Sequence, residues 1–184
     1  MRFGRLAMVL AFTAVFSCGV LAAEGFAPRT GAFDPGYYVI VSASTGLALT
    51  VDYETCAEDG AGVFLWEYEG FACQEWQILE YGEGIYSIVN RQSGKALTLD
   101  WYGIFEPGSG IVQWYDLAYP NQHWRFRIFD EASYLLQSAE SELCVGAVEI
   151  YPDPFPRPHR RIRQMEFTGE DNQIWVLRLV TDRP

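Results

Sequence analysis

The stretch SGKALTLD, residues 93–100, repeats an earlier stretch, STGLALTVD, residues 44–52. A shift of 48 positions superimposes the two, and the same shift places Trp66 on Trp114 and Trp76 on Trp124. That register holds for about forty residues without a gap. Because tryptophan is rare, two coincident tryptophans indicate an internal repeat, which constrains the fold before any other feature does.

A third copy begins near residue 132. Tyr134 and Cys144 fall where Tyr86 and Ala96 predict, and after the insertion PDPFPRPHRR the pattern resumes at Ile162. The tetrapeptide NQIW at 172–175 then ends the third copy, as NQHW at 121–124 ends the second. We therefore expect one domain over residues 36–184, with lobes at 36–83, 84–131 and 132–181.

Each copy has the composition of short β-strands. Apolar, β-branched and aromatic residues run up to turns that contain glycine. The expected strands lie within 36–46, 84–94, 61–68, 109–116, 74–81, 122–129 and 173–180. No stretch has helical periodicity with caps. A unit of about 48 residues cannot bury its apolar face alone, so the sequence predicts a closed all-β fold in which three lobes share one core.

The first residues resemble a secretory leader. Arg2 and Arg5 precede an apolar run from Leu6 to Ala23, with small residues at its end. We predict a signal peptide at 1–23, an N-terminal extension at 24–35, and a secreted or periplasmic mature chain. Lipid attachment at Cys18 is disfavoured by the bulky Phe16 and by the apolar run that continues past it. No later stretch is long enough to span a bilayer.

The charge restricts the partners. The formal net charge is −11, and it becomes more negative once the two leader arginines are removed. An acidic chain repels phosphate backbones, so a nucleic-acid partner is not expected.

Three cysteines follow the leader: Cys56, Cys73 and Cys144. An exported chain permits a disulfide, and Cys56 with Cys73, close in sequence and in one copy, is the candidate pair. Cys144 is then free and buried. Metal binding is the weaker interpretation because no Cys-x-x-Cys or His-Cys spacing occurs, and we expect neither a metal nor a cofactor.

Three Gln-x-Trp tripeptides close the copies, at 74–76, 122–124 and 173–175. In phase with the hairpin repeat, they resemble the ricin-type β-trefoil lectin family over about residues 36–179. The resemblance implies a six-stranded barrel closed by a cap of hairpins, with at most one shallow sugar site per lobe. It implies structural, core roles for Trp76, Trp124 and Trp175.

The resemblance also implies where a sugar would bind. Family sites use an aspartate after the first hairpin, an aromatic platform from the middle strand and the polar pair that begins Gln-x-Trp. A carboxylate accepts strong hydrogen bonds from hydroxyl groups, and a flat ring packs against the C–H face of a pyranose. The second lobe has all of these: Asp100, Gln113, Trp114, Asn121 and Gln122.

The other lobes are less complete. The first has Asp52, Trp66 and Gln74, but Cys73 stands where Asn121 would be. In the third, Val148 and Met165 replace the aspartate and the tryptophan. We rank the second lobe above the first and expect none in the third.

Departures from ricin itself weaken any transfer of galactose specificity. Ala48 and Ala96 replace its cysteine, and Thr50 and Thr98 replace its aspartate. Each candidate also has a structural alternative: Asp100 could cap a turn, and the amides could satisfy buried backbone groups. Tyr53, Trp101, Tyr102 and Phe105 widen the platform if exposed and fill the cap if buried.

These features predict a secreted lectin-like module that binds glycans or glycoconjugates and is not an enzyme. No Gly-x-Ser-x-Gly elbow, phosphate loop or zinc signature occurs. One alternative is an interaction module or protease inhibitor that contacts a protein partner through the basic, proline-rich Pro152–Arg163 loop. Another is the cell-binding subunit of an exported toxin.

Overall fold

The computed structural model describes residues 26, 27, 29–148 and 160–181, and within them it is built from twelve β-strands joined by short turns. The strands run β1 Tyr38–Ser42, β2 Ala48–Val51, β3 Val63–Trp66, β4 Trp76–Gly82, β5 Ile85–Asn90, β6 Ala96–Leu99, β7 Ile111–Trp114, β8 Trp124–Ile128, β9 Ser133–Ser138, β10 Cys144–Val148, β11 Arg160–Met165 and β12 Ile174–Leu179. Four 3-10 turns separate them: η2 Ala72–Gln74, η3 Trp101–Gly103, η4 Pro120–Gln122 and η5 Asp171–Gln173. The all-β prediction is confirmed.

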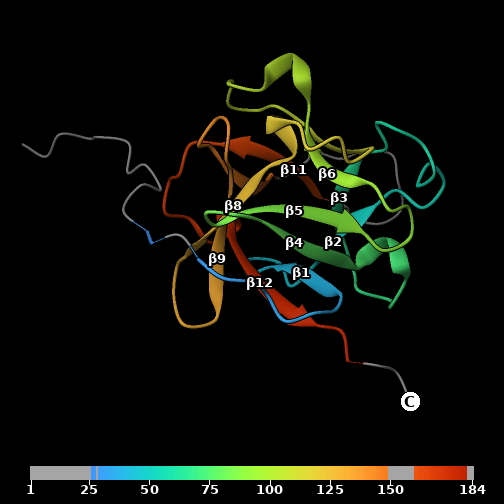
Figure 1. Ribbon diagram of the computed structural model, residues 1–184, viewed down its shortest axis with the longest axis horizontal. Coiled ribbons are helices and arrows are strands. Elements are labelled where there is room, and N and C mark those ends of the chain that lie inside the picture. Colours follow the sequence, from blue (N-terminus) through green and yellow to red (C-terminus); the bar gives the residue numbers. More distant parts are fainter. Residues whose placement is uncertain (1–25, 28, 149–159, 182–184) are drawn as a thin grey trace, which may run out of the picture.

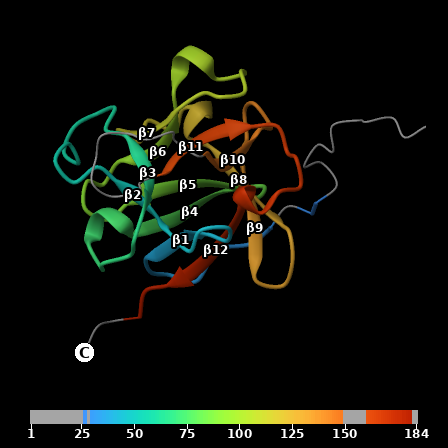
Figure 2. The same cartoon turned by 180° about the vertical axis from the view of Figure 1, so that it is seen from behind.

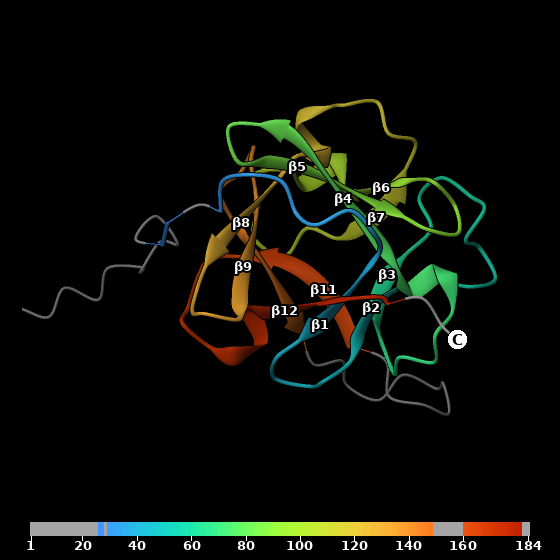
Figure 3. The ribbon, with the colours of Figure 1, turned by 60° about the horizontal axis from the view of Figure 1, so that its bottom comes forward.

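Six strands form a closed barrel. Strand β1 pairs with β12 and β4, β4 with β5, β5 with β8, β8 with β9, and β9 with β12, all antiparallel. Figure 3 shows the pairs β4–β5, β8–β9 and β12–β1 around a common centre. Closure leaves no unpaired barrel edge, which removes a route to edge-to-edge aggregation.

Three hairpins, β2–β3, β6–β7 and β10–β11, form the cap (Figures 1 and 2). Their registers repeat: Ala48 faces Trp66, Ala96 faces Trp114 and Cys144 faces Met165. Strand β11 also pairs with β3, and single bridges link Gly62 to Val112 and Gly110 to Arg163. The three copies therefore build one β-trefoil, as the sequence predicts.

The core combines alternate residues of the cap strands with the barrel interior. Leu49, Leu97 and Val145 point into it, and the three motif tryptophans are fully buried among them. Threonines Thr50 and Thr98 face the opposite side of their strands, under the motif glutamines.

Phe33 of the N-terminal extension packs against this core, which the sequence did not reveal. The ring of Phe33 lies 5.0–6.1 Å from those of Phe126, Tyr86, Tyr38 and Tyr134. The three tyrosines are equivalent residues of the three lobes, so one phenylalanine contacts all three lobes at the barrel. Tyr86 donates a hydrogen bond to the Gly31 carbonyl at 2.9 Å, which ties the extension down.

Replacing Phe33 by alanine tests this plug. The change removes a half-buried ring that contacts all three lobes, so we expect the free energy of unfolding to fall by about 2 kcal/mol, less than for a fully buried aromatic. Urea denaturation measures it. Phe105→Ala, which truncates a largely exposed ring, is the control and should change stability by less than about 0.5 kcal/mol. Equal effects of the two variants would contradict the plug.

Candidate functional site

The motif glutamines Gln74 and Gln122 are buried and hold loops. The Gln122 carboxamide accepts from the Leu117 amide at 2.9 Å and donates to the Tyr115 carbonyl at 2.6 Å and the Thr98 hydroxyl at 3.1 Å. Gln74 makes the equivalent bonds around Glu67–Phe71. Their hydrogen-bonding groups are used inside the protein, so the prediction that they contact sugar does not fit this geometry.

Gln113 is also buried and joins two lobes. Its amide nitrogen donates to the carbonyls of Cys56 at 2.5 Å and Glu58 at 3.2 Å in the first lobe, while its oxygen accepts from Ser93 at 2.6 Å. Gln164 does the same one lobe further on, donating to three carbonyls between Gly103 and Glu106. Both are interlobe clasps, and Gln113 is not placed to bind a sugar.

Asn121 is buried beside Asp100 and donates to the Leu99 carbonyl at 2.9 Å. Its side-chain oxygen is buried and has no hydrogen-bond partner. The same arrangement recurs at Asn172, which donates to the Ala147 carbonyl and also has an unpartnered oxygen. Because the third lobe lacks the aspartate and the tryptophan, this geometry belongs to the repeat and does not mark a sugar site.

The aspartates lie at the surface. Asp100 accepts a hydrogen bond from the Tyr102 amide at 3.2 Å, and Asp52 accepts one from the Glu54 amide at 3.0 Å. Each bond uses one carboxylate oxygen to fix the turn, and both side chains are half-buried. A turn-capping role is therefore present, and it leaves the carboxylates at the surface.

Trp114 is 43% exposed and stands at the other end of the β6–β7 hairpin from Asp100. It faces Ala96, four residues before Asp100, which corresponds to about 13 Å along an extended strand. Its indole leans toward the first lobe, where its Cζ3 atom lies 3.5 Å from the place that a β carbon on Gly60 would occupy. The two predicted second-lobe contacts thus do not converge on one point. Trp66 is half-buried at the equivalent place in the first lobe.

Lys95 supports the surface beside Trp114. Its ammonium group lies 2.6 Å from the Asp59 carboxylate and 3.7 Å from the centre of the Tyr115 ring. The lysine side chain is buried, so the ion pair and the cation–π contact hold Tyr115 against the first-lobe loop.

Exposed aromatic residues gather on the second lobe. Of the fourteen large apolar side chains that are exposed in the described part of the chain, seven lie between residues 101 and 119: Trp101, Tyr102, Phe105, Trp114, Tyr115, Leu117 and Tyr119. Between residues 53 and 71 of the first lobe, the exposed large apolar side chains are Tyr53, Tyr68 and Phe71. Turn η3, which carries Trp101 and Tyr102, projects from the top of the molecule in Figures 1 and 2. Tyr53, Trp101, Tyr102 and Phe105 are therefore exposed and do not fill the cap.

Cys56, Cys73 and Cys144 are free and buried, so the predicted Cys56–Cys73 disulfide is wrong. Both thiols lie in the main core, where close packing against apolar neighbours keeps them as small hydrophobic residues. Burial raises the pKa of Cys56, and it raises the pKa of Cys73 to about 11 and that of Cys144 to about 12.

Most of the Pro152–Arg163 loop lies outside the described residues. Its last residues belong to strand β11, where Arg163 donates to the Gly108 carbonyl. Among the described residues, no group of three or more His, Cys, Asp and Glu side chains could hold a metal ion. No helical segment of this part of the chain is long and apolar enough to cross a membrane.

Comparisons with known proteins agree with this architecture. The family model for ricin-type beta-trefoil lectin domain-like sequences matches residues 28–114. No curated protein matches. The designed threefold-symmetric protein ThreeFoil is similar at 30% identity over 77% of this chain and 97% of its own, with a TM-score of 0.68.

Two natural proteins have similar structures. An exo-beta-1,3-galactanase from Clostridium thermocellum is 26% identical over 80% of this chain, with a TM-score of 0.71, and the chain spans 31% of it. The Rhizoctonia solani agglutinin is 16% identical over 83% of this chain and 100% of its own, with a TM-score of 0.66. The agglutinin supports the fold alone.

The Gln113 clasp can be tested with Gln113→Leu, because leucine is the residue at the equivalent position 65. The variant leaves two carbonyls in the first-lobe loop without their donor, which should lower the free energy of unfolding by about 1–3 kcal/mol. Urea denaturation measures the loss, and faster amide exchange over residues 55–60 should locate it. Gln92→Leu, on an exposed turn, should show neither effect.

The thiols give a second test. A raised pKa lowers the fraction of reactive thiolate, so at pH 8 a thiol with a pKa near 11 should react about two orders of magnitude more slowly than an unperturbed one. Ellman's reagent should therefore label Cys56, Cys73 and Cys144 slowly in the folded protein and at once in the urea-unfolded protein. A mass lower by two hydrogens in the untreated protein would instead show a disulfide.

Proposed function

Because the chain belongs to the ricin-type β-trefoil lectin family, we propose that it is a secreted carbohydrate-binding protein whose main glycan surface lies on the second lobe. The observation that carries this proposal is the number of exposed aromatic side chains in the second lobe between residues 101 and 119, in a lobe that also presents the half-buried Asp100. Aromatic faces pack against the C–H faces of sugars, and the carboxylate accepts hydroxyl protons.

The separation of Trp114 from Asp100 sets the size of the ligand. At about 13 Å along the strand, one monosaccharide does not reach both groups. We propose that the two side chains contact different units of an oligosaccharide. Gln113, Asn121 and Gln122 position the loops beneath this surface, and the first lobe with Asp52, Tyr53 and Trp66 offers a smaller version of it.

We also propose that the chain binds glycans without cleaving them. Its family is one of carbohydrate-binding domains, and its likeness to the galactanase covers less than a third of that enzyme. An open, shallow surface of this kind does not exclude water as a hydrolytic cleft does.

A glycan array with the mature protein tests the proposal. We expect oligosaccharides to bind and single sugars to bind weakly. Trp114→Ala and Asp100→Ala should each weaken the best ligand about tenfold, which corresponds to about 1.4 kcal/mol. Ile128→Ala truncates an exposed apolar side chain away from this surface and is the matched control. A folded wild-type protein that binds no glycan, or variants that bind as well as wild type, would contradict the assignment.

A further inference from the structure

The interface between the first and second lobes places a carboxylate beside exposed aromatic residues. The Gly60 amide donates a hydrogen bond to the Gln113 carbonyl at 2.8 Å, so the first-lobe turn that carries Asp59 and Gly60 lies alongside strand β7. Strand β7 ends at Trp114, and Tyr115 follows it. The turn therefore brings a first-lobe acid to the aromatic end of the second-lobe hairpin.

Asp59 and Tyr115 both contact one ammonium group. The Nζ atom of Lys95 lies 2.6 Å from Asp59 Oδ1 and 3.7 Å from the centre of the Tyr115 ring. The lysine side chain is only 7% exposed, whereas the aspartate side chain is 28% exposed. The buried lysine thus fixes the position of a carboxylate that still reaches the surface.

The Trp114 indole lies on the same turn. Its Cζ3 atom is 3.5 Å from the place that a β carbon on Gly60, the residue after Asp59, would occupy. Both rings are open to solvent, because Trp114 is 43% exposed and Tyr115 is 61% exposed. Asp59 therefore supplies, beside these rings, the carboxylate that Asp100 at the other end of the hairpin does not.

The interface between the second and third lobes has the same backbone arrangement with different side chains. The Gly108 amide donates to the Gln164 carbonyl at 2.8 Å, as Gly60 does to Gln113. The residues equivalent to Asp59, Lys95, Trp114 and Tyr115 are, in that order, Pro107, Leu143, Met165 and Glu166. Burying a lysine in an ion pair is often no more stable than apolar packing of similar volume. The trefoil therefore does not depend on this ion pair, which needs another explanation.

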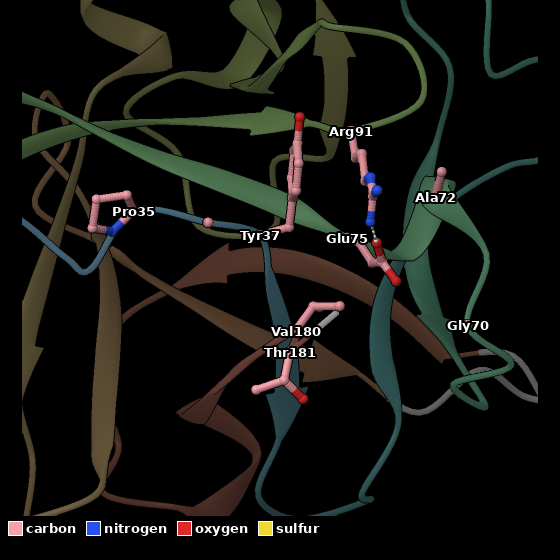
Figure 4. A pocket seen from close by; sticks show the side chains of 9 residues that line it. Pro35, Tyr37, Gly70, Ala72, Glu75, Arg91, Val180 and Thr181 are labelled. Carbon is pink, nitrogen blue, oxygen red and sulfur yellow. Dashed lines mark hydrogen bonds and ion pairs between the residues drawn. The ribbon is translucent and has the colours of Figure 1, made fainter. Parts of the chain in front are cut away.

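A different ion pair in the first lobe has a carboxylate that is closed to ligands. It lies at a pocket of about 900 Å³, where the Glu75 carboxylate is 2.6 Å from the Arg91 guanidinium and accepts a hydrogen bond from the Tyr68 hydroxyl at 2.8 Å. Figure 4 shows Glu75 and Arg91 facing each other at the wall of this pocket. The Glu75 side chain is 1% exposed. Asp59 differs because its paired carboxylate remains at the surface.

We infer that Asp59, Trp114 and Tyr115 form a subsite for one neutral hexose unit of the glycan. The flat rings pack against the C–H face of a pyranose. The carboxylate accepts hydrogen bonds from neighbouring hydroxyl groups, and such charge-assisted bonds are stronger than neutral ones. The same negative charge repels a uronate, so the subsite selects uncharged sugars. This inference rests on the proposed carbohydrate-binding function and assigns residues and a sugar class to the Trp114 end of its surface.

The test follows the indole N–H signal of Trp114 by NMR during titration of the folded protein with methyl glycosides of galactose, glucose and mannose. The sodium salts of galacturonate, glucuronate and mannuronate, at equal ionic strength, are the charged counterparts. We expect at least one neutral glycoside to bind with a dissociation constant on the order of millimolar. Its uronate counterpart should bind at least tenfold more weakly.

Asp59→Asn keeps an oxygen for Lys95 and removes the charge. It should weaken the neutral glycoside about tenfold and remove most of the preference over the uronate. A general loss of stability would not produce that change in preference. Glu131→Gln makes the matched change on an exposed turn between β8 and β9, and it should alter neither affinity.

A double variant, Asp59→Pro with Lys95→Leu, introduces the side chains of the next interface. Glu58 precedes Asp59 as Glu106 precedes Pro107, so the turn should fold as it does there. This variant removes both members of the ion pair together and leaves no lone buried charge. It should weaken the neutral glycoside at least tenfold.

The possible outcomes separate this subsite from the lectin surface as a whole. Folded Asp59 variants that bind as well as wild type, while Trp114→Ala loses binding, would overturn the inference and leave the proposed function standing. So would a uronate that binds as tightly as the neutral glycoside, or a wild-type protein that binds an oligosaccharide on an array but no methyl glycoside at Trp114. A wild-type protein that binds no glycan in either experiment would overturn both.

Discussion

The structure depends on one hydrogen bond that is made three times. The indole N–H groups of Trp76, Trp124 and Trp175 donate to the carbonyls of Leu49, Leu97 and Val145, each at 2.9 Å, and all three rings are fully buried. Each bond links the first residue or two of a barrel strand to a cap strand of the same lobe, so it fixes the cap on the barrel. A buried N–H without a partner would cost about 1–3 kcal/mol, and here none of the three is left without one.

Around this constant frame the lobes differ, and the differences separate structural residues from candidates for function. Position 113 and its equivalent 164 are glutamines that clasp the preceding lobe, whereas position 65 is leucine. The position of Tyr81 and Phe129 in two lobes is held by Val180, beside a pocket, in the third. A feature present in every lobe serves the trefoil; one confined to a single lobe needs another reason.

Most of the fold could be predicted from the sequence, but little of the candidate site. The 48-residue register predicted the strands, the three lobes and the buried tryptophans, because apolar periodicity and rare residues record packing directly. It did not predict the Phe33 plug, since a lone phenylalanine in an extension has no periodic partner. Gln113 and Gln122 were predicted to contact sugar because the sequence does not show whether a glutamine amide is buried or faces a ligand. Only the structure reveals that both side chains are buried and bonded to backbone carbonyls. The Cys56–Cys73 bridge failed similarly, because sequence spacing does not reveal whether two thiols are bonded.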